Sequence, residues 1–147
     1  MKILIISVGK KHDDTVQAGI LEFEKRLGAD HVIEWKIIPS STMRDEGEII
    51  ERAFKEGDFI VALDDKGKEM ETREVSEWLN KIQVEGSKRL VFVIGGSYGL
   101  DSLVFTKARV SWSLSKLTFP HQLVRLILVE QLYRAFSILK GSKYHHE

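Results

Sequence analysis

The feature that most limits the fold of this chain is a repeated alternation of short apolar segments with amphipathic helical patterns. The segments rich in Ile and Val have strand length and are typical of buried strands; they span residues 1–8, 31–38, 58–63, 89–94 and 110–114. A helical pattern follows each of them, and the longest covers residues 121–139. This order predicts the α/β class, with a mostly parallel sheet and helices on both faces. The length of 147 residues predicts a single domain over residues 1–147.

Helix boundaries follow from polar capping residues and from glycines. Asp13 or Asp14 is expected to cap the first helix, which Gly28 ends. Thr72 and Asp101 are expected to cap two later helices, because their side-chain oxygens can accept from free backbone N–H groups. Residues 40–47 are polar and predict a loop, and residues 64–68 have the composition of a turn.

Composition and charge exclude several classes of protein. The hydrophobic content of 43% argues against disorder, and no apolar run approaches the ~20 residues that span a bilayer. We therefore expect a cytoplasmic protein that does not contact membranes. The net charge is zero, but residues 1–75 have 12 Lys and Arg against 17 Asp and Glu, whereas residues 76–147 have 10 against 5. A polyanionic partner would prefer the second half.

Three loops are the natural place for a ligand. In open parallel sheets, ligands bind at the carboxyl ends of the strands. The loops in question follow Leu63, Ile94 and Leu114. The second of these is rich in glycine over Gly95–Gly99, and glycines after a buried strand let backbone N–H groups approach a ligand closely. The alternative is a tight strand-to-helix turn that binds nothing.

The glycine spacing excludes two common nucleotide sites. It reads G-G-x-x-G, which is neither the dinucleotide pattern G-x-G-x-x-G nor a phosphate loop ending in G-K-S or G-K-T. The same residues do match G-x-S-x-G, the nucleophile elbow of serine hydrolases, with Ser97 as nucleophile. Glu130 and His145 would complete that triad in chain order. A mid-helix position for Glu130 and the short chain weaken this hydrolase hypothesis.

The five histidines do not predict a metal site. His12 and His31 are isolated, His145 and His146 are adjacent, and the chain has no cysteine. Residues 110–133 form a short strand, a hydroxyl-rich loop and the start of the long helix, which includes Arg125. From the residues alone, this unit indicates an α/β ligand-binding domain whose chemistry stays open.

Several long motifs, in order, resemble one known family. The most specific are VIGGSYGL at residues 93–100, WSLSKLTFPH at residues 112–121, and the segment from Arg125 to Ala135. The opening strand ending Val8-Gly9-Lys10 and the closing Tyr144-His145 fit the same pattern. Together they cover nearly the whole chain, which is similar to the RlmH family of SPOUT methyltransferases.

This resemblance implies a fold, a cofactor and a substrate. The family has a C-terminal trefoil knot, here over about residues 90–140, whose loops hold S-adenosylmethionine (SAM). The implied cofactor residues are Leu63, Gly95, Gly96, Leu114, Ser115, Lys116, Leu117, Thr118 and Phe119. The implied reaction is methylation of N3 of a pseudouridine in 23S rRNA, on the assembled ribosome, by a homodimer whose active sites use residues of both chains.

The resemblance also suggests which residues act on the substrate. The target nitrogen must lose its proton, and the candidate bases are His121, His145 and, less favoured, Glu130. Tyr144 is expected to stack on the flipped base, and Arg125 is expected to hold phosphate. This chain has His146-Glu147 where the family commonly has a basic residue after Tyr-His. A non-catalytic RNA-binding module on the same fold is the second alternative.

Overall fold

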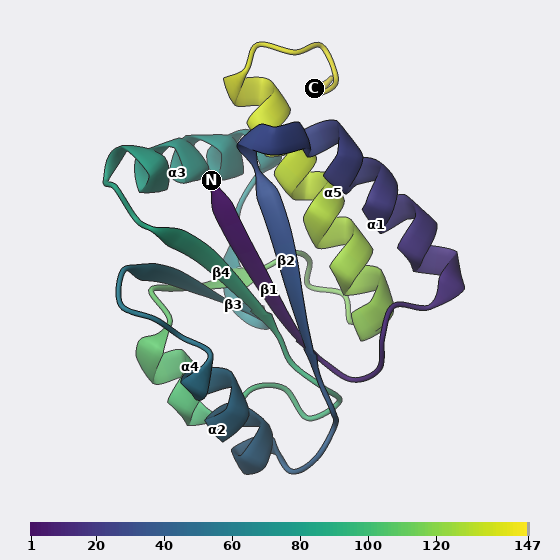
Figure 1. The fold of residues 1–147 in the computed structure, drawn as a ribbon, viewed down its shortest axis with the longest axis vertical. Helices are drawn as coiled ribbons and strands as arrows, with labels where there is room; N and C mark the ends of the chain where they lie inside the picture. The colour runs from purple at the N-terminus through teal and green to yellow at the C-terminus, as the bar shows by residue number, and fades with distance from the viewer. Residues whose placement is uncertain (147) are drawn as a thin grey trace.

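The computed structural model describes residues 1–146 as a five-stranded sheet between two layers of helices (Figure 1). The elements are β1 (Lys2–Val8), α1 (Asp14–Leu27), the short 3₁₀ helix η1 (Gly28–Asp30), β2 (Val32–Ile38), α2 (Met43–Arg52), β3 (Asp58–Glu69), α3 (Thr72–Val84), β4 (Arg89–Ile94), α4 (Ser102–Lys107), β5 (Val110–Ser113) and α5 (His121–Leu139). The α/β class predicted from the alternation is confirmed.

The sheet is parallel throughout, with strand order β2-β1-β4-β3-β5. The central strands β1 and β4 are almost wholly buried, as their continuous apolar sequences require. At one edge, β2 alternates between exposed and partly buried residues. β5 forms the other edge beside β3, although β4 precedes it among the strands in the chain. After β4, the chain therefore passes beyond β3 to form β5 at the edge of the sheet, and α5 then packs back over one face of the sheet.

Each face of the sheet has its own core. One face packs against α1, α3 and α5, and its centre includes Phe92, Trp112 and Leu132. The opposite face packs against α2 and α4 around Ile50 and Val104. Figure 1 shows α5 lying beside α1 on the first face.

Capping explains where several helices begin and end. The Asp101 side chain accepts from Leu103 N at 2.9 Å at the start of α4, as predicted. Gly28, at φ 71°, ends α1. The Thr42 hydroxyl accepts from Asp45 N at 3.1 Å, so α2 begins inside the segment predicted to be a loop. Thr72 does not cap α3; its hydroxyl donates instead to Gln131 Oε1 at 2.8 Å.

Two further predictions are wrong in detail. The turn predicted at residues 64–68 lies within β3, because Lys68 and Glu69 pair with β5 after a register shift that begins at Leu63. The sequence pattern predicts that the apolar side of α5 consists of Leu123, Ile127, Leu132, Ala135, Phe136 and Leu139. Leu132, Ala135 and Phe136 are buried, whereas Leu123 and Leu139 are 43% and 39% exposed. The buried side also includes Arg125 and Leu128, which the pattern did not indicate. Because α5 is apolar on most sides, its periodicity does not identify the side that faces the sheet.

Candidate functional site

A cleft of about 370 Å³ opens where β4 and β5 end, beside the register shift of β3 that begins at Leu63. A volume of this size suits a small organic ligand, since such sites span roughly 300–1,000 Å³. The cleft lies where the sequence predicted it, because the loops after Ile94 and Leu114 meet there beside residues 63–65 of β3. Its lining residues are Leu63, Asp64, Asp65, Ile94, Gly95, Gly96, Ser97, Gly99, Leu100, Phe105, Trp112, Leu114, Ser115, Leu117, Thr118, Phe119, Pro120, His121 and Val124.

The glycine loop is a compact turn closed by its own backbone. Gly99 N donates to Gly96 O at 3.0 Å, and Gly99 adopts φ +82°, which favours glycine. A Cβ on Gly95 would lie 2.9 Å from the carbonyl carbon of Gly99. Gly95 is therefore required by the loop itself, before any ligand is considered.

The loop after β5 is held by hydroxyl groups. Ser113 Oγ donates to Ser115 O at 2.8 Å, and Leu117 N donates to Ser115 Oγ at 3.0 Å. These bonds fix the loop along one wall of the cleft. Lys116 alone among the predicted cofactor residues does not line it. Its side chain is 85% exposed, and Nζ lies 3.8 Å from Glu69 Oε1.

Several lining residues were not predicted. Asp64 and Asp65 follow Leu63 directly, and their position at a strand end was the available indication. They add negative charge to a cleft that is otherwise mainly apolar. Phe105 reaches the cleft from α4 and Val124 from α5, and both contributions depend on how distant elements pack.

Of the candidate catalytic residues, His121 lines the cleft, whereas Arg125, one turn further along α5, does not. Burial, and secondarily the Arg125 guanidinium, lowers the pKa of His121, so its imidazole tends to stay neutral. The Arg125 side chain is completely buried. Its Nε donates to Ser7 Oγ at 2.8 Å and its Nη1 to Lys10 O at 2.8 Å. Arg125 is thus not placed to hold a phosphate at the surface.

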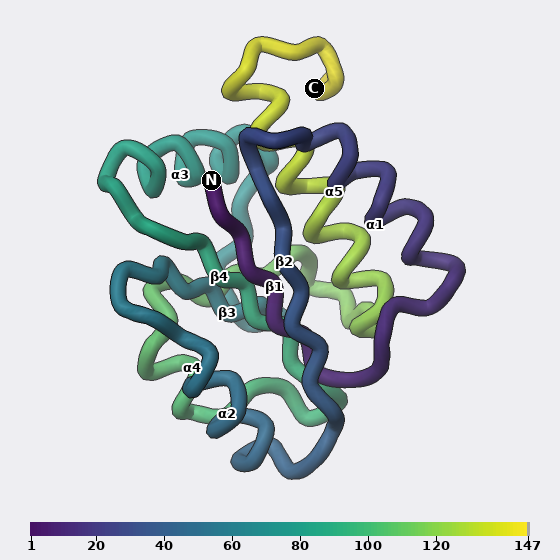
Figure 2. Tube along the Cα trace, in the orientation of Figure 1, coloured from purple at the N-terminus to yellow at the C-terminus, as the bar shows by residue number. Residues whose placement is uncertain are grey.

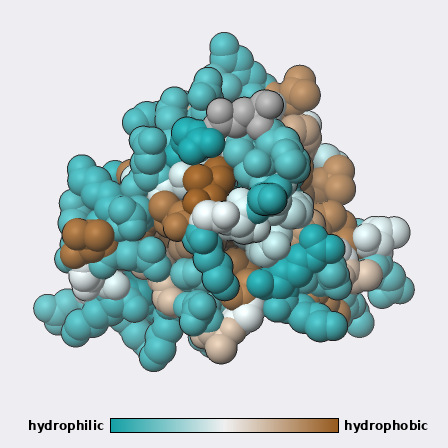
Figure 3. Space-filling view, turned by 90° about the horizontal axis from the view of Figure 1, so that it is seen from above, coloured by the Kyte–Doolittle hydropathy of each residue, from teal (hydrophilic) through white to brown (hydrophobic). Residues whose placement is uncertain are grey.

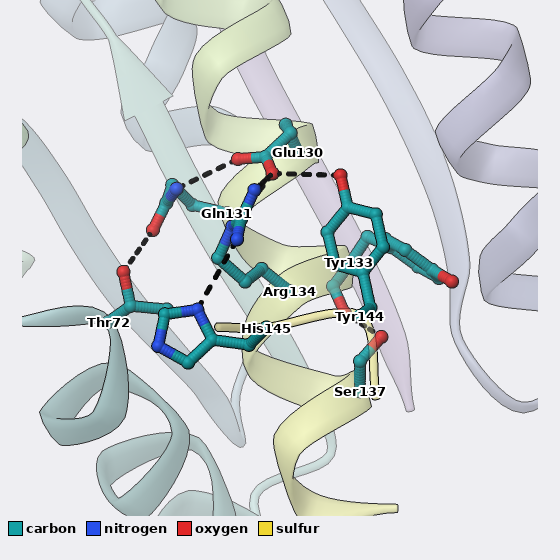
Figure 4. Close-up of polar contacts among 8 residues, drawn as sticks. All are labelled: Thr72, Glu130, Gln131, Tyr133, Arg134, Ser137, Tyr144 and His145. Atoms are coloured by element: carbon teal, nitrogen blue, oxygen red, sulfur yellow. Dashed lines mark hydrogen bonds and ion pairs between the residues drawn. The ribbon is translucent and has the colours of Figure 1, made fainter. Parts of the chain in front are cut away.

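The C-terminal tail folds back onto the second half of α5 (Figure 4). Glu130 accepts hydrogen bonds from Tyr144 Oη at 3.1 Å and from Arg134 Nη2 at 2.6 Å. The Tyr144 ring packs edge-on against Tyr133, and Arg134 Nη1 lies 3.3 Å from His145 Nδ1. Burial, then the Glu130 carboxylate, raises the pKa of Tyr144, which keeps the phenol protonated as donor. The tail is therefore docked rather than frayed.

Within one chain, this tail does not reach the cleft. His121 begins α5, whereas the tail packs against Arg134, 13 residues later, which corresponds to about 20 Å along a helix. Figure 2 shows the tail at the end of the molecule where β1 begins. Seen from that end, the surface is mostly polar with a small group of apolar side chains near its middle (Figure 3).

The hydrolase triad is not assembled. Ser97 is exposed in the loop after β4, whereas Glu130 and His145 belong to the tail network near the opposite end of the sheet. The Glu130 carboxylate already accepts from Arg134 and Tyr144. In the described part of the chain, no cluster of three His, Asp or Glu side chains is placed to hold a metal ion. None of the helices in residues 1–146 is long and apolar enough to cross a membrane.

Comparisons with known proteins decide the family. The family model described as "Predicted SPOUT methyltransferase" matches residues 1–145. This chain belongs to the SPOUT methyltransferase family. The resemblance found from the sequence motifs is therefore confirmed, and the parallel α/β sheet fits this family.

Curated relatives show which members of the SPOUT family this chain is similar to in sequence. The chain is 49% identical over 157 aligned positions to the ribosomal RNA large subunit methyltransferase H of Bacteroides fragilis, and the match covers 100% of both chains. It is 39% identical to the protein of the same name from Clostridium botulinum, with 99% of each chain covered. A solved structure of a probable methylase family protein from Haemophilus influenzae has the same fold, with a TM-score of 0.57 at 10% identity over 99% of this chain and 70% of that one.

Proposed function

We propose that the protein is a SAM-dependent methyltransferase that modifies N3 of a pseudouridine in 23S rRNA. The observation that supports this most is the cleft, because the three segments expected from the sequence to hold SAM meet in it. Membership of the SPOUT family over residues 1–145 and the names of the relatives agree with an rRNA substrate. The protein would act in the cytoplasm, where ribosomes are found.

The cleft has the chemistry that SAM needs. Apolar side chains such as Leu117 and Phe119 suit a flat adenine ring, and the backbone groups of the glycine loop suit its polar edges. SAM has an ammonium and a sulfonium group, which the carboxylates of Asp64 and Asp65 complement in charge. When bound, SAM would supply an electrophilic methyl group.

His121 is the candidate base within this cleft. A pseudouridine N3–H must lose its proton before the nitrogen can accept a methyl group, and a neutral imidazole can take that proton. The lowered pKa of His121 keeps the imidazole in the neutral form at physiological pH. Holding the nucleotide in line with the methyl group would supply much of the acceleration.

We further propose a homodimer in which the tail of one chain completes the cleft of the other. Tyr144 and His145 are docked against α5 far from their own cleft, so a role for them in catalysis requires a second chain. The exposed apolar residues Leu123 and Leu139 on α5 offer surface for that chain. The trefoil knot over about residues 90–140 is part of the same proposal.

Methyl transfer from labelled SAM to ribosomes tests this function. Ribosomes that lack the modification should be good substrates. The same 23S rRNA without ribosomal proteins should be a poor substrate, because residues 76–147 are only modestly basic and should bind isolated RNA weakly. Equal rates on both would contradict the ribosome requirement. Calorimetric binding of SAM without any transfer would favour the non-catalytic RNA-binding module.

Removal of the tail tests the shared site. A chain without residues 143–147 should remain folded and bind SAM, whereas methyl transfer should fall by about a hundredfold, as loss of an acid–base group does. Sedimentation velocity at micromolar concentration should show dimers for both proteins. Transfer at the full rate by the shortened chain would mean that Tyr144 and His145 are not used.

A further inference from the structure

Arg125 is a fully buried cation that forms no salt bridge within the described residues 1–146, and the only carboxylate that favours its charge there, that of Asp13, acts from beyond salt-bridge distance. A buried charge without a salt-bridge partner is costly, and departures of this kind are expected at functional or strained sites. Three neutral groups receive its hydrogen bonds instead: Ser7 Oγ, Lys10 O and, at 3.3 Å, His12 Nδ1. Its Nη2 has no hydrogen-bond partner within the described chain.

These bonds join the start of α5 to the segment between β1 and α1. Ser7 belongs to β1, and residues 9–13 link that strand to α1. Gln122, one turn before Arg125, adds two more bonds, from its Nε2 to Lys11 O at 3.1 Å and to its Oε1 from Asp13 N at 3.0 Å. Residues 10–13 are thus each hydrogen-bonded to Gln122 or Arg125 in the first two turns of α5.

The clamped segment forms the seat of the His121 ring. A Cβ on Gly9 would lie only 2.8 Å from His121 Nε2, so the imidazole packs directly on the backbone of Gly9. Gly9 has φ +129°, a conformation that side chains rarely allow. Any movement of residues 9–13 would therefore move the support of a cleft residue.

We propose that Arg125 is a positioning residue for methyl transfer, which clamps residues 9–13 to α5 and so seats the His121 imidazole in the cleft. The inference rests on the proposed function, because it assigns His121 to that reaction. It replaces the surface phosphate contact expected from the sequence. Arg125 touches neither cofactor nor substrate in this role.

The charge of Arg125 adds to its geometric role. The positive guanidinium opposes protonation of both histidines near it, although burial is the larger reason why the pKa values of His121 and His12 are lowered. Asp13 acts in the opposite direction on His121. The other charged groups near His121 are Asp64 and Asp65 across the cleft and Lys10 and Lys11 on the clamped segment.

Two substitutions separate charge from geometry. Arg125→Gln removes the charge, so the pKa of His121, followed by NMR in the protein without cofactor, should rise toward its ordinary value of about 6.5. The acid limb of kcat should move to higher pH by the same amount. Arg125→Lys keeps the charge but not the forked bonds, so the acid limb should stay in place while kcat falls about tenfold. KM for ribosomes should change little in either variant.

Matched variants keep the test decisive. Arg52→Gln removes one positive charge from the exposed surface of α2 and should leave the His121 titration unchanged. Ser7→Ala removes one clamp partner with little change in volume and should speed amide hydrogen exchange at residues 10–13. The inference is overturned if His121 titrates identically in wild type and Arg125→Gln, or if Ser7→Ala leaves that exchange unaltered. Because both measurements need no methyl transfer, they remain informative if the proposed function fails.

Discussion

Replacement of Gly95 by alanine should both destabilise the protein and weaken cofactor binding, because the added Cβ disturbs the glycine loop. The added Cβ would lie 2.9 Å from Gly99 C and 3.0 Å from both Gly99 O and Leu100 Cδ2. Two of these atoms are backbone atoms of a turn closed by the bond from Gly99 N to Gly96 O, so the turn itself must open. Overpacking of this kind costs about 1–3 kcal/mol.

The displaced turn should also weaken cofactor binding. Gly95, Gly96 and Gly99 all line the cleft, so a shift of their backbone changes the groups offered to the ligand. We expect the affinity for SAM, measured by titration calorimetry, to fall at least about tenfold, or about 1.4 kcal/mol. The midpoint of thermal unfolding should fall by about 2–4 °C for each kcal/mol lost.

Gly86→Ala is the matched control. Gly86 adopts φ +81° with no atom within 4 Å of its added Cβ, so alanine there is strained by its backbone alone, at a cost of about 1–2 kcal/mol. Gly86 follows α3 and precedes β4, at the opposite end of that strand from the cleft. This control should lose stability and keep its SAM affinity. If Gly95→Ala binds SAM as tightly as the control does, the glycine loop is not part of the cofactor site.

Two further predictions concern stability. Asp58→Asn removes the negative charge of a carboxylate that accepts a hydrogen bond from Arg89 at 2.7 Å, where the Asp58 and Arg89 side chains are 2% and 16% exposed. Loss of this buried ion pair should lower the free energy of unfolding, measured by urea titration, by about 3–5 kcal/mol. A loss below about 1 kcal/mol would contradict the prediction. Burial, then the N-terminal amine, lowers the pKa of His31, so the unfolded chain binds more protons below about pH 6.5 and stability should fall on acidification from that value. His31→Phe, which retains the ring stacked on Phe136, should reduce that dependence between about pH 7.5 and pH 5.5. The rest of the dependence should remain, because the pKa values of His12 and His121 are lowered too, and an unchanged slope would exclude His31 as one of its sources.

Local patterns predict most of the elements in this protein. α5 has the predicted bounds of residues 121–139, and Asp101 caps α4 as expected. The end of β3 was misplaced because residues 64–69 look like a turn, and only their pairing with distant β5 makes them a strand. The start of α2 was missed although Thr42 precedes Asp45 at capping distance, because its first turn is polar.

The position of the cleft follows from the sequence more readily than the arrangement of the charged side chains around it. Strand ends and the glycine loop identified the cleft without knowledge of the structure. The burial of Arg125 could have been predicted from spacing, since this residue lies three positions before the buried Leu128 on the same side of α5. Arginine is so rarely buried that this spacing is not persuasive alone. The contacts of Tyr144 with Glu130 and Tyr133 required the three-dimensional arrangement of the tail.

The length of α5 fixes both the distance and the rotation between the cleft and the docked tail. Its 19 residues span about 28 Å, with His121 at one end and the contacts of the tail at the other. One residue inserted into α5 would lengthen the helix by about 1.5 Å and rotate the tail about the helix axis by about 100°. An insertion of about seven residues, close to two whole turns, would preserve the rotation but not the length. Relatives that share this arrangement should therefore vary in their loops and keep the length of α5 constant.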